Sequence, residues 1–85
     1  MLDKNNDPVE WGTWLYEFTD AIEHLENLTD EIGENDELCE ESLRIGLGHI
    51  YSHLNRAWNS RNHRGEITEE KWTKFSDFPK DLDWT

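Results

Sequence analysis

Two histidines, His49 and His53, stand four residues apart, so that a helix would place both imidazoles on one face. This is the spacing of a zinc-binding pair, in which neutral ring nitrogens coordinate the metal. No acid lies between them, which excludes the metalloprotease helix motif, and residues 42–65 offer no obvious third ligand. A third ligand would come from Asp20 or His24, or from the C-terminal segment. The pair therefore indicates either a metal site or two histidines that pack and hydrogen-bond at a helix boundary.

A second candidate site is a run rich in arginine, asparagine and histidine, here called the polar cluster. Its members are Arg56, Asn59, Arg61, Asn62, His63 and Arg64. Arginine forks and asparagine amides bind carboxylates, phosphates and peptide groups. The same side chains can instead cap the carbonyls at the end of a helix and bond to the next segment. Asparagine is a poor helix former, so something other than propensity favours it here, and both interpretations stay open.

Two arginine–histidine pairs, Arg44-x4-His49 and Arg56-x6-His63, resemble the Arg-x(4–6)-His pattern of the HEPN ribonucleases, which are all-helical. The resemblance implies an RNA-cleaving protein in which His63 is the general acid and base and Arg56 stabilises phosphate. It covers only these residues. The residue after each arginine is apolar rather than polar, and the chain is short for that four-helix fold.

The charges are segregated along the chain. Residues 1–41 hold 14 acids and one base, whereas residues 42–65 hold four arginines and no acid. Six acids form what we call the acidic loop: Glu31, Glu34, Asp36, Glu37, Glu40 and Glu41. A field of this sign repels nucleic acid and speeds association with positive surfaces. We therefore expect a protein partner with a basic surface and no direct nucleic-acid binding, with a nucleic-acid mimic as an alternative.

The elements that position these residues follow from apolar periodicity. Asp7 and Pro8 begin a pattern of i, i+3, i+4 and i+7 that predicts a helix over 8–29. Gly33 is expected at its exit, and a second helix is expected over 36–62, capped by Asn35 or Asp36. Because the second helix is apolar on two sides, with Ile45 on the second, it is expected to be central and covered on both.

The C-terminal part is expected to pack against the second helix. Gly65 suits a left-handed turn, and Thr68 is the expected cap of a third helix over 69–76. Residues 77–85, which include Trp84, form a packed tail, and residues 1–6 form a flexible one. In the hairpin, acids of the first helix would face the arginines that end the second. The acids of this set are Asp7, Glu10 and Glu17, and the arginines are Arg56, Arg61 and Arg64, with no individual pairing specified.

Composition limits what such a chain can be. Its 85 residues are 34% hydrophobic with a net charge of −12, which excludes a large enzyme, a two-domain protein and a membrane-spanning protein. Cys39 is the single cysteine, and it lies on an apolar helical face, which predicts a buried structural thiol. No secretion signal is apparent, so we expect a cytoplasmic protein that does not bind membranes.

These observations predict an all-α fold, an antiparallel two-helix hairpin with a short third helix and an aromatic C-terminal tail, in a single small domain. The function that they favour is a non-enzymatic, acidic protein-interaction or regulatory module without a cofactor. Because a chain this polar can complete its core by self-association, a homodimer is the alternative to a different protein partner. The metal-binding and RNA-cleaving interpretations remain as alternatives.

Overall fold

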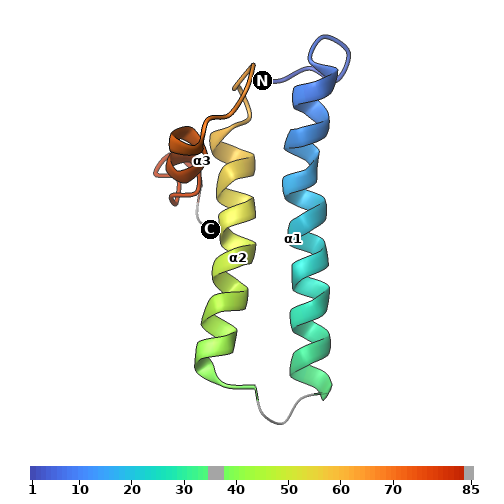
Figure 1. The fold of residues 1–85 in the computed structure, drawn as a ribbon, viewed down its shortest axis with the longest axis vertical. Helices are drawn as coiled ribbons and strands as arrows, with labels where there is room; N and C mark the ends of the chain where they lie inside the picture. Colours follow the sequence, from blue (N-terminus) through green and yellow to red (C-terminus); the bar gives the residue numbers. More distant parts are fainter. Residues whose placement is uncertain (35–37, 84–85) are drawn as a thin grey trace.

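The computed structural model describes residues 1–34 and 38–83, and this part of the chain is all-helical. Its elements are α1 (Pro8–Glu34), α2 (Glu40–Asn59) and α3 (Glu69–Phe75). The two long helices lie side by side as an antiparallel hairpin, and α3 lies beside α2 near the end away from the hairpin turn (Figure 1). The molecule is elongated, with extents of 47 × 29 × 25 Å. The predicted fold class is confirmed.

The helix bounds differ from those predicted. α1 runs five residues further than expected, through Gly33 to Glu34, because one glycine costs a helix only about 1 kcal/mol and does not end it as proline would. α2 is shorter at both ends. Its N-cap is Cys39, in extended conformation and without a side-chain cap bond. The predicted caps Asn35 and Asp36 lie outside the described residues.

The helix–helix contact is close and small. Among the described residues, the side chains of Leu2, Ala21, Leu28, Ile50 and Ala57 form the buried hydrophobic core. A Cβ at position 46 would lie 3.1 Å from Leu28 Cδ1, so glycine there admits this leucine. The two long helices therefore approach each other closely at Gly46, where the Leu28 side chain fills the space beside the glycine. At Gly48 a Cβ would meet nothing within 4 Å.

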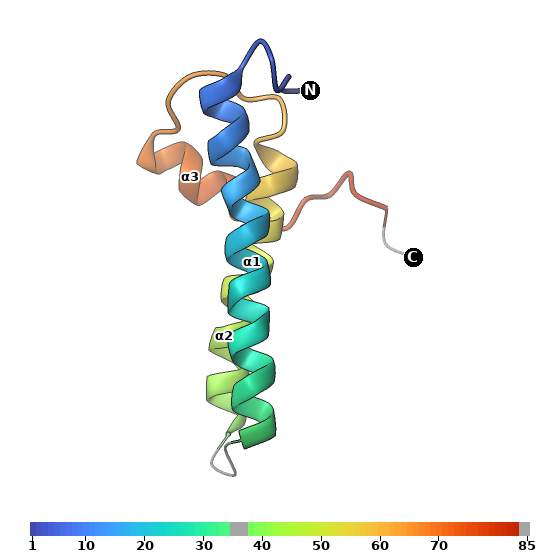
Figure 2. The ribbon, with the colours of Figure 1, turned by 90° about the vertical axis from the view of Figure 1, so that its right-hand side faces the viewer.

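The expectation that α2 is covered on both sides along its length is not met. Ile45, on the predicted second side, is 55% exposed. The short α3 reaches only the C-terminal half of α2, where Asn55 donates to the Ser76 carbonyl at 2.9 Å. Figure 2 shows α3 on one side of the hairpin and the segment that follows it on the other. Half of α2 therefore has α1 as its one neighbour among the described elements.

The first residues are ordered against the end of α2, where a flexible tail was expected. Leu2 is 5% exposed, and its N–H donates to the Arg61 carbonyl at 2.8 Å. The Asp3 N–H donates to the Asp7 carboxylate at 3.0 Å, which folds the segment into a turn. The prediction of a flexible N-terminal tail was wrong. The Arg61 carbonyl, just beyond the end of α2, needs a hydrogen-bond donor, and the Leu2 backbone N–H supplies it.

The C-terminal part follows the prediction more closely. The Thr68 hydroxyl accepts from the Lys71 N–H at 3.3 Å, which confirms the predicted cap of α3. Gly65 has a φ of 88°, as expected for a left-handed turn. Pro79 is buried in the tail, whereas Trp84 lies outside the described residues. No helix in the described part is long and apolar enough to span a bilayer.

Candidate functional site

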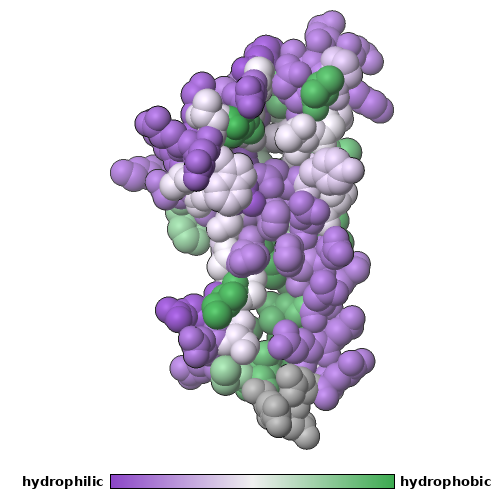
Figure 3. All heavy atoms as spheres, in the orientation of Figure 1, coloured by the Kyte–Doolittle hydropathy of each residue, from purple (hydrophilic) through white to green (hydrophobic). Residues whose placement is uncertain are grey.

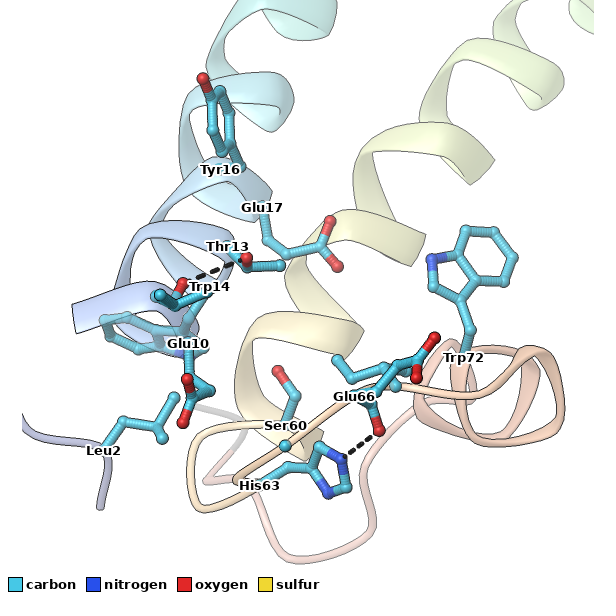
Figure 4. A pocket seen from close by; sticks show the side chains of 13 residues that line it. Leu2, Glu10, Thr13, Trp14, Tyr16, Glu17, Ser60, His63, Glu66 and Trp72 are labelled. Atoms are coloured by element: carbon cyan, nitrogen blue, oxygen red, sulfur yellow. Dashed lines mark hydrogen bonds between the residues drawn. The ribbon is translucent and has the colours of Figure 1, made fainter. Parts of the chain in front are cut away.

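A buried ion pair joins the two long helices. Arg56 on α2 is 6% exposed, and its Nε donates to Glu17 Oε2 on α1 at 2.6 Å. Its Nη2 lies 3.3 Å from Glu17 Oε1, and His53 Nδ1 lies 2.9 Å from the same oxygen. Figure 4 shows the Glu17 carboxylate reaching from α1 towards α2. Both residues belong to the sets of acids and arginines that the charge pattern predicted to face each other.

Arg56 also holds α3. Its Nη1 donates to the Ser76 hydroxyl at 2.9 Å, and its guanidinium carbon lies 4.2 Å from the centre of the Trp72 ring. Because all three guanidinium nitrogens have partners and the side chain is buried, its polar groups are occupied within the chain. Arg56 thereby connects three helices through one side chain. The phosphate-stabilising role that the ribonuclease resemblance implies would require this guanidinium to leave its partners.

The next members of the polar cluster fasten the tail. Asn59 Nδ2 donates to the carbonyls of Phe75 at 2.8 Å and Asp77 at 2.9 Å. Arg61 stacks over Trp58, with 3.7 Å from guanidinium carbon to ring centre, and its Nη2 lies 3.7 Å from Asp81 Oδ2. These contacts fit the capping network better than an exposed recognition surface.

The last members close the end of the hairpin. Arg64 Nε donates to Asp7 Oδ1 at 3.2 Å, a second pair between the predicted sets of acids and arginines. The His63 ring packs edge-on against Phe75, and its Nε2 lies 3.1 Å from the Glu66 carbonyl. Asn62 is exposed and makes no side-chain hydrogen bond to the described residues. Arg61 was expected opposite an acid of α1, but its partner is an acid of the tail.

The structure brings a third histidine to the predicted pair. The His24 ring of α1 lies 5.4 Å from the His49 ring and 5.2 Å from the His53 ring, centre to centre. Sequence reasoning had named His24 as one source of a third ligand. However, no group of three or more His, Cys, Asp or Glu within 1–34 and 38–83 is arranged to hold a metal ion. The three imidazoles pack against one another at the helix boundary.

The acidic loop lies at the distal end of the hairpin. Its described members, Glu31, Glu34, Glu40 and Glu41, are all exposed and make no ion pair with described residues. Asp36 and Glu37 lie outside the described residues. Glu40 and Glu41 in the first turn of α2 interact favourably with the dipole of that helix. Glu31 and Glu34 at the C-terminal end of α1 interact unfavourably with the dipole of α1, and the last turn of α1 contains no basic residue.

Cys39 was expected to be buried, but it is exposed as the first residue before α2. The helix that would have placed it on an apolar stripe begins one residue later. Its Sγ lies 3.4 Å from the Ser42 hydroxyl. Hydrogen bonds from the Ser42 side chain and backbone hold the pKa of the Cys39 thiol below its ordinary value.

The surface that sequence reasoning missed is apolar. Six exposed side chains form what we call the apolar face: Ile22, Leu25 and Ile32 from α1, and Leu47, Tyr51 and Leu54 from α2. Each of the six is between 38% and 57% exposed. The signal was present in the sequence, since each long helix carries more apolar positions than one contact stripe can use.

Both halves of the apolar face lie on the same flank of the hairpin. The opposite flank is marked by the ion pair of Glu17 with Arg56 and by the ring contact of His24 with His49. Successive helical residues are about 100° apart. Ile22 lies about 100° around α1 from the buried Ala21, and Tyr51 lies about 100° around α2 from the buried Ile50, whereas His24 and His53 lie on the other side of these buried residues. Figure 3 shows the side on which α3 lies, where hydrophilic residues cover most of α1.

A shallow groove runs along the α1 part of the apolar face, lined by Ile22, Leu25, Glu26, Thr29 and Asp30. On the α2 part, the Tyr51 ring lies 5.5 Å from the Phe78 ring of the tail. The face is thus bounded by carboxylates on one long helix and by the tail on the other.

No protein-family model matches this chain, and comparison with curated proteins and with solved structures found no similar protein.

Proposed function

We propose that the protein is a small acidic interaction module that binds a basic amphipathic helix of a protein partner on its apolar face. The observation that carries this proposal is the presence of two exposed apolar stripes, one from each long helix, on one flank of the hairpin. Amphipathic helices bind by laying an apolar stripe into a groove of this kind. Such a helix would complete a third layer over a hairpin that buries few apolar side chains by itself.

The charge of the partner follows from the acids beside the groove. Glu26 and Asp30 line it together with apolar residues, and neither has an ion-pair partner among the described residues. The whole chain carries a net charge of −12. Lysines and arginines that flank an apolar stripe on the partner would meet these carboxylates. They would speed association and make the affinity depend on salt.

A second copy of the chain is less suited to this face. Arg56, Arg61 and Arg64 are already paired with Glu17, Asp81 and Asp7. A second copy would therefore bring its own surplus of acid and few free bases. The repulsion between two chains of the same sign opposes a homodimer at low salt, so a basic partner is the better occupant.

The test uses a labelled leucine–lysine peptide of about 18 residues, with leucine at i, i+3, i+4 and i+7. Its control is a scrambled peptide of equal composition. We expect the patterned peptide to bind the full chain by fluorescence anisotropy, with affinity falling as salt rises. Ile22→Ser should weaken binding at least about tenfold, because burying an isoleucine contributes about 1.5–3 kcal/mol.

The matched control is Ile45→Ser. Ile45 is 55% exposed and Ile22 is 57% exposed, but Ile45 lies outside the apolar face. It should leave peptide binding unchanged. Equal binding of the scrambled peptide, or equal losses in the two variants, would overturn the proposal. So would a stable dimer in sedimentation velocity that Ile22→Ser dissociates, because a second copy would then occupy the face.

A further inference from the structure

A cavity of about 660 Å³ lies between the N-terminal half of α1, the segment after α2, and Trp72 of α3 (Figure 4). Thr13, in its lining, is about 180° around α1 from Ile22, so the cavity opens on the opposite flank from the apolar face. Its volume falls within the range of roughly 300–1,000 Å³ that holds small molecules. It is therefore a second site, independent of the one proposed above.

The walls of this cavity are apolar and held in place. Trp14, Tyr16 and Trp72 line it together with the aliphatic side chains of Leu2, Val9 and Ile67. The Trp14 indole N–H donates to the Ala57 carbonyl at 2.7 Å, which fixes that ring. The Trp72 ring is fixed by the Arg56 guanidinium over it. Rings that are already positioned can accept a flat apolar group at little ordering cost.

The charges in the lining select the ligand. Glu10, Glu17 and Glu66 line the cavity, and none of its lining residues is a lysine or arginine. Glu17 is compensated by Arg56 at 2.6 Å. The side chains of Glu10 and Glu66 have no hydrogen-bond or ion-pair partner among the described residues. Two uncompensated carboxylates beside aromatic walls favour a cation and repel an anion.

We infer that this cavity binds a small organic cation, an ammonium group carried on an aromatic body. The ring would lie against Trp72, and the ammonium would lie towards Glu66 on the same side of the cavity, within the field of Glu10 (Figure 4). Volume, aromatic walls and uncompensated charge all point to this class of ligand. Neither the apolar face nor the acidic loop takes part.

The test is a titration of the full chain with tryptamine, followed by the indole N–H signals in ¹H–¹⁵N NMR spectra. Indole-3-propionate is the control ligand, because it carries a carboxylate in place of the ammonium. We expect saturable shifts at Trp72 with tryptamine, and binding of the propionate at least about tenfold weaker. The double variant Glu10→Gln/Glu66→Gln should weaken tryptamine binding about fivefold or more.

Glu31→Gln, an exposed acid at the far end of α1, is the matched control and should leave the affinity unchanged. Since Glu66 is exposed and Glu10 half-buried, the double variant keeps the fold, which the unchanged indole signals of the free protein would report. Absence of saturable shifts at millimolar tryptamine would overturn the inference. So would equal affinity for the two ligands, or no loss in the double variant.

Discussion

Glu17→Gln is the substitution that most sharply tests how the helices are held together. It keeps the size of the side chain and removes the charge that faces Arg56 at 2.6 and 3.3 Å and His53 at 2.9 Å. Arg56, 6% exposed, would be left as a buried cation without its anion. Breaking such a pair from one side costs about 3–5 kcal/mol. The Glu17 side chain is 18% exposed, so we expect the lower end, about 3 kcal/mol.

In a chain of this length, about 3 kcal/mol lowers the melting temperature by about 12–24 °C. Thermal unfolding followed by far-ultraviolet circular dichroism measures it. Glu23→Gln, at an exposed position of the same helix, is the matched control and should cost no more than about 0.5 kcal/mol. If the two variants unfold at the same temperature, the ion pair does not stabilise the hairpin and the reasoning is refuted.

Three further outcomes are expected. Gly48→Ala should stabilise α2 by about 0.5–1 kcal/mol, whereas Gly46→Ala, whose Cβ would lie 3.1 Å from a leucine, should gain less or destabilise, as urea unfolding would show. The Trp58 indole N–H donates to Asp81 and holds the pKa of this carboxyl below its ordinary value. Because the pKa is lower in the folded chain, the tail contact stabilises the fold at pH values above the ordinary pKa, and this stabilisation is lost as the pH falls through the folded pKa. A pH titration of the Trp58 indole NMR signal should report this loss, and Asp81→Asn should remove the dependence. Cys39, exposed and with a lowered pKa, should be alkylated by iodoacetamide at lower pH than a free cysteine peptide, and an equal pH profile would count against the hydrogen-bonded thiol.

The fold was predictable because its signals are local. The i, i+3, i+4 pattern after Pro8 and the cap at Thr68 each require only neighbouring residues, and both occur in the structure. The segregated charges also predicted that acids of α1 would face the arginines at the end of α2, and the structure pairs Glu17 with Arg56 and Asp7 with Arg64, whereas Glu10 has no ion-pair partner among the described residues. These pairs were accessible to sequence reasoning because an antiparallel hairpin fixes which ends meet.

What the sequence left open depends on contacts between distant segments. Leu2 belongs to the core because its backbone N–H donates to the Arg61 carbonyl beyond the end of α2, which brings the N-terminus against the hairpin. Ile45 is exposed because α3 is too short to reach the first half of α2. Cys39 is exposed because α2 begins after it. The apolar periodicity was visible, but whether each stripe is buried depends on how far α3 extends.

The apolar face itself illustrates this limit. Ile22 and Leu25 read as core residues in the sequence, since they fall on the helical period. A two-helix hairpin buries one stripe per helix, and in the structure Ala21 and Leu28 occupy that place. The surplus stripe becomes the binding surface only when the pairing of the helices is known.

The most direct test of the central claim is the location of the bound peptide. Backbone amide shifts of the full chain, recorded by NMR with and without the leucine–lysine helix, would map it. The account predicts the largest shifts between 22 and 32 on α1 and between 47 and 54 on α2, with little change around Glu17 or Trp72. Shifts centred on the polar flank or on the acidic loop would contradict it, because the peptide would then be held by charge alone.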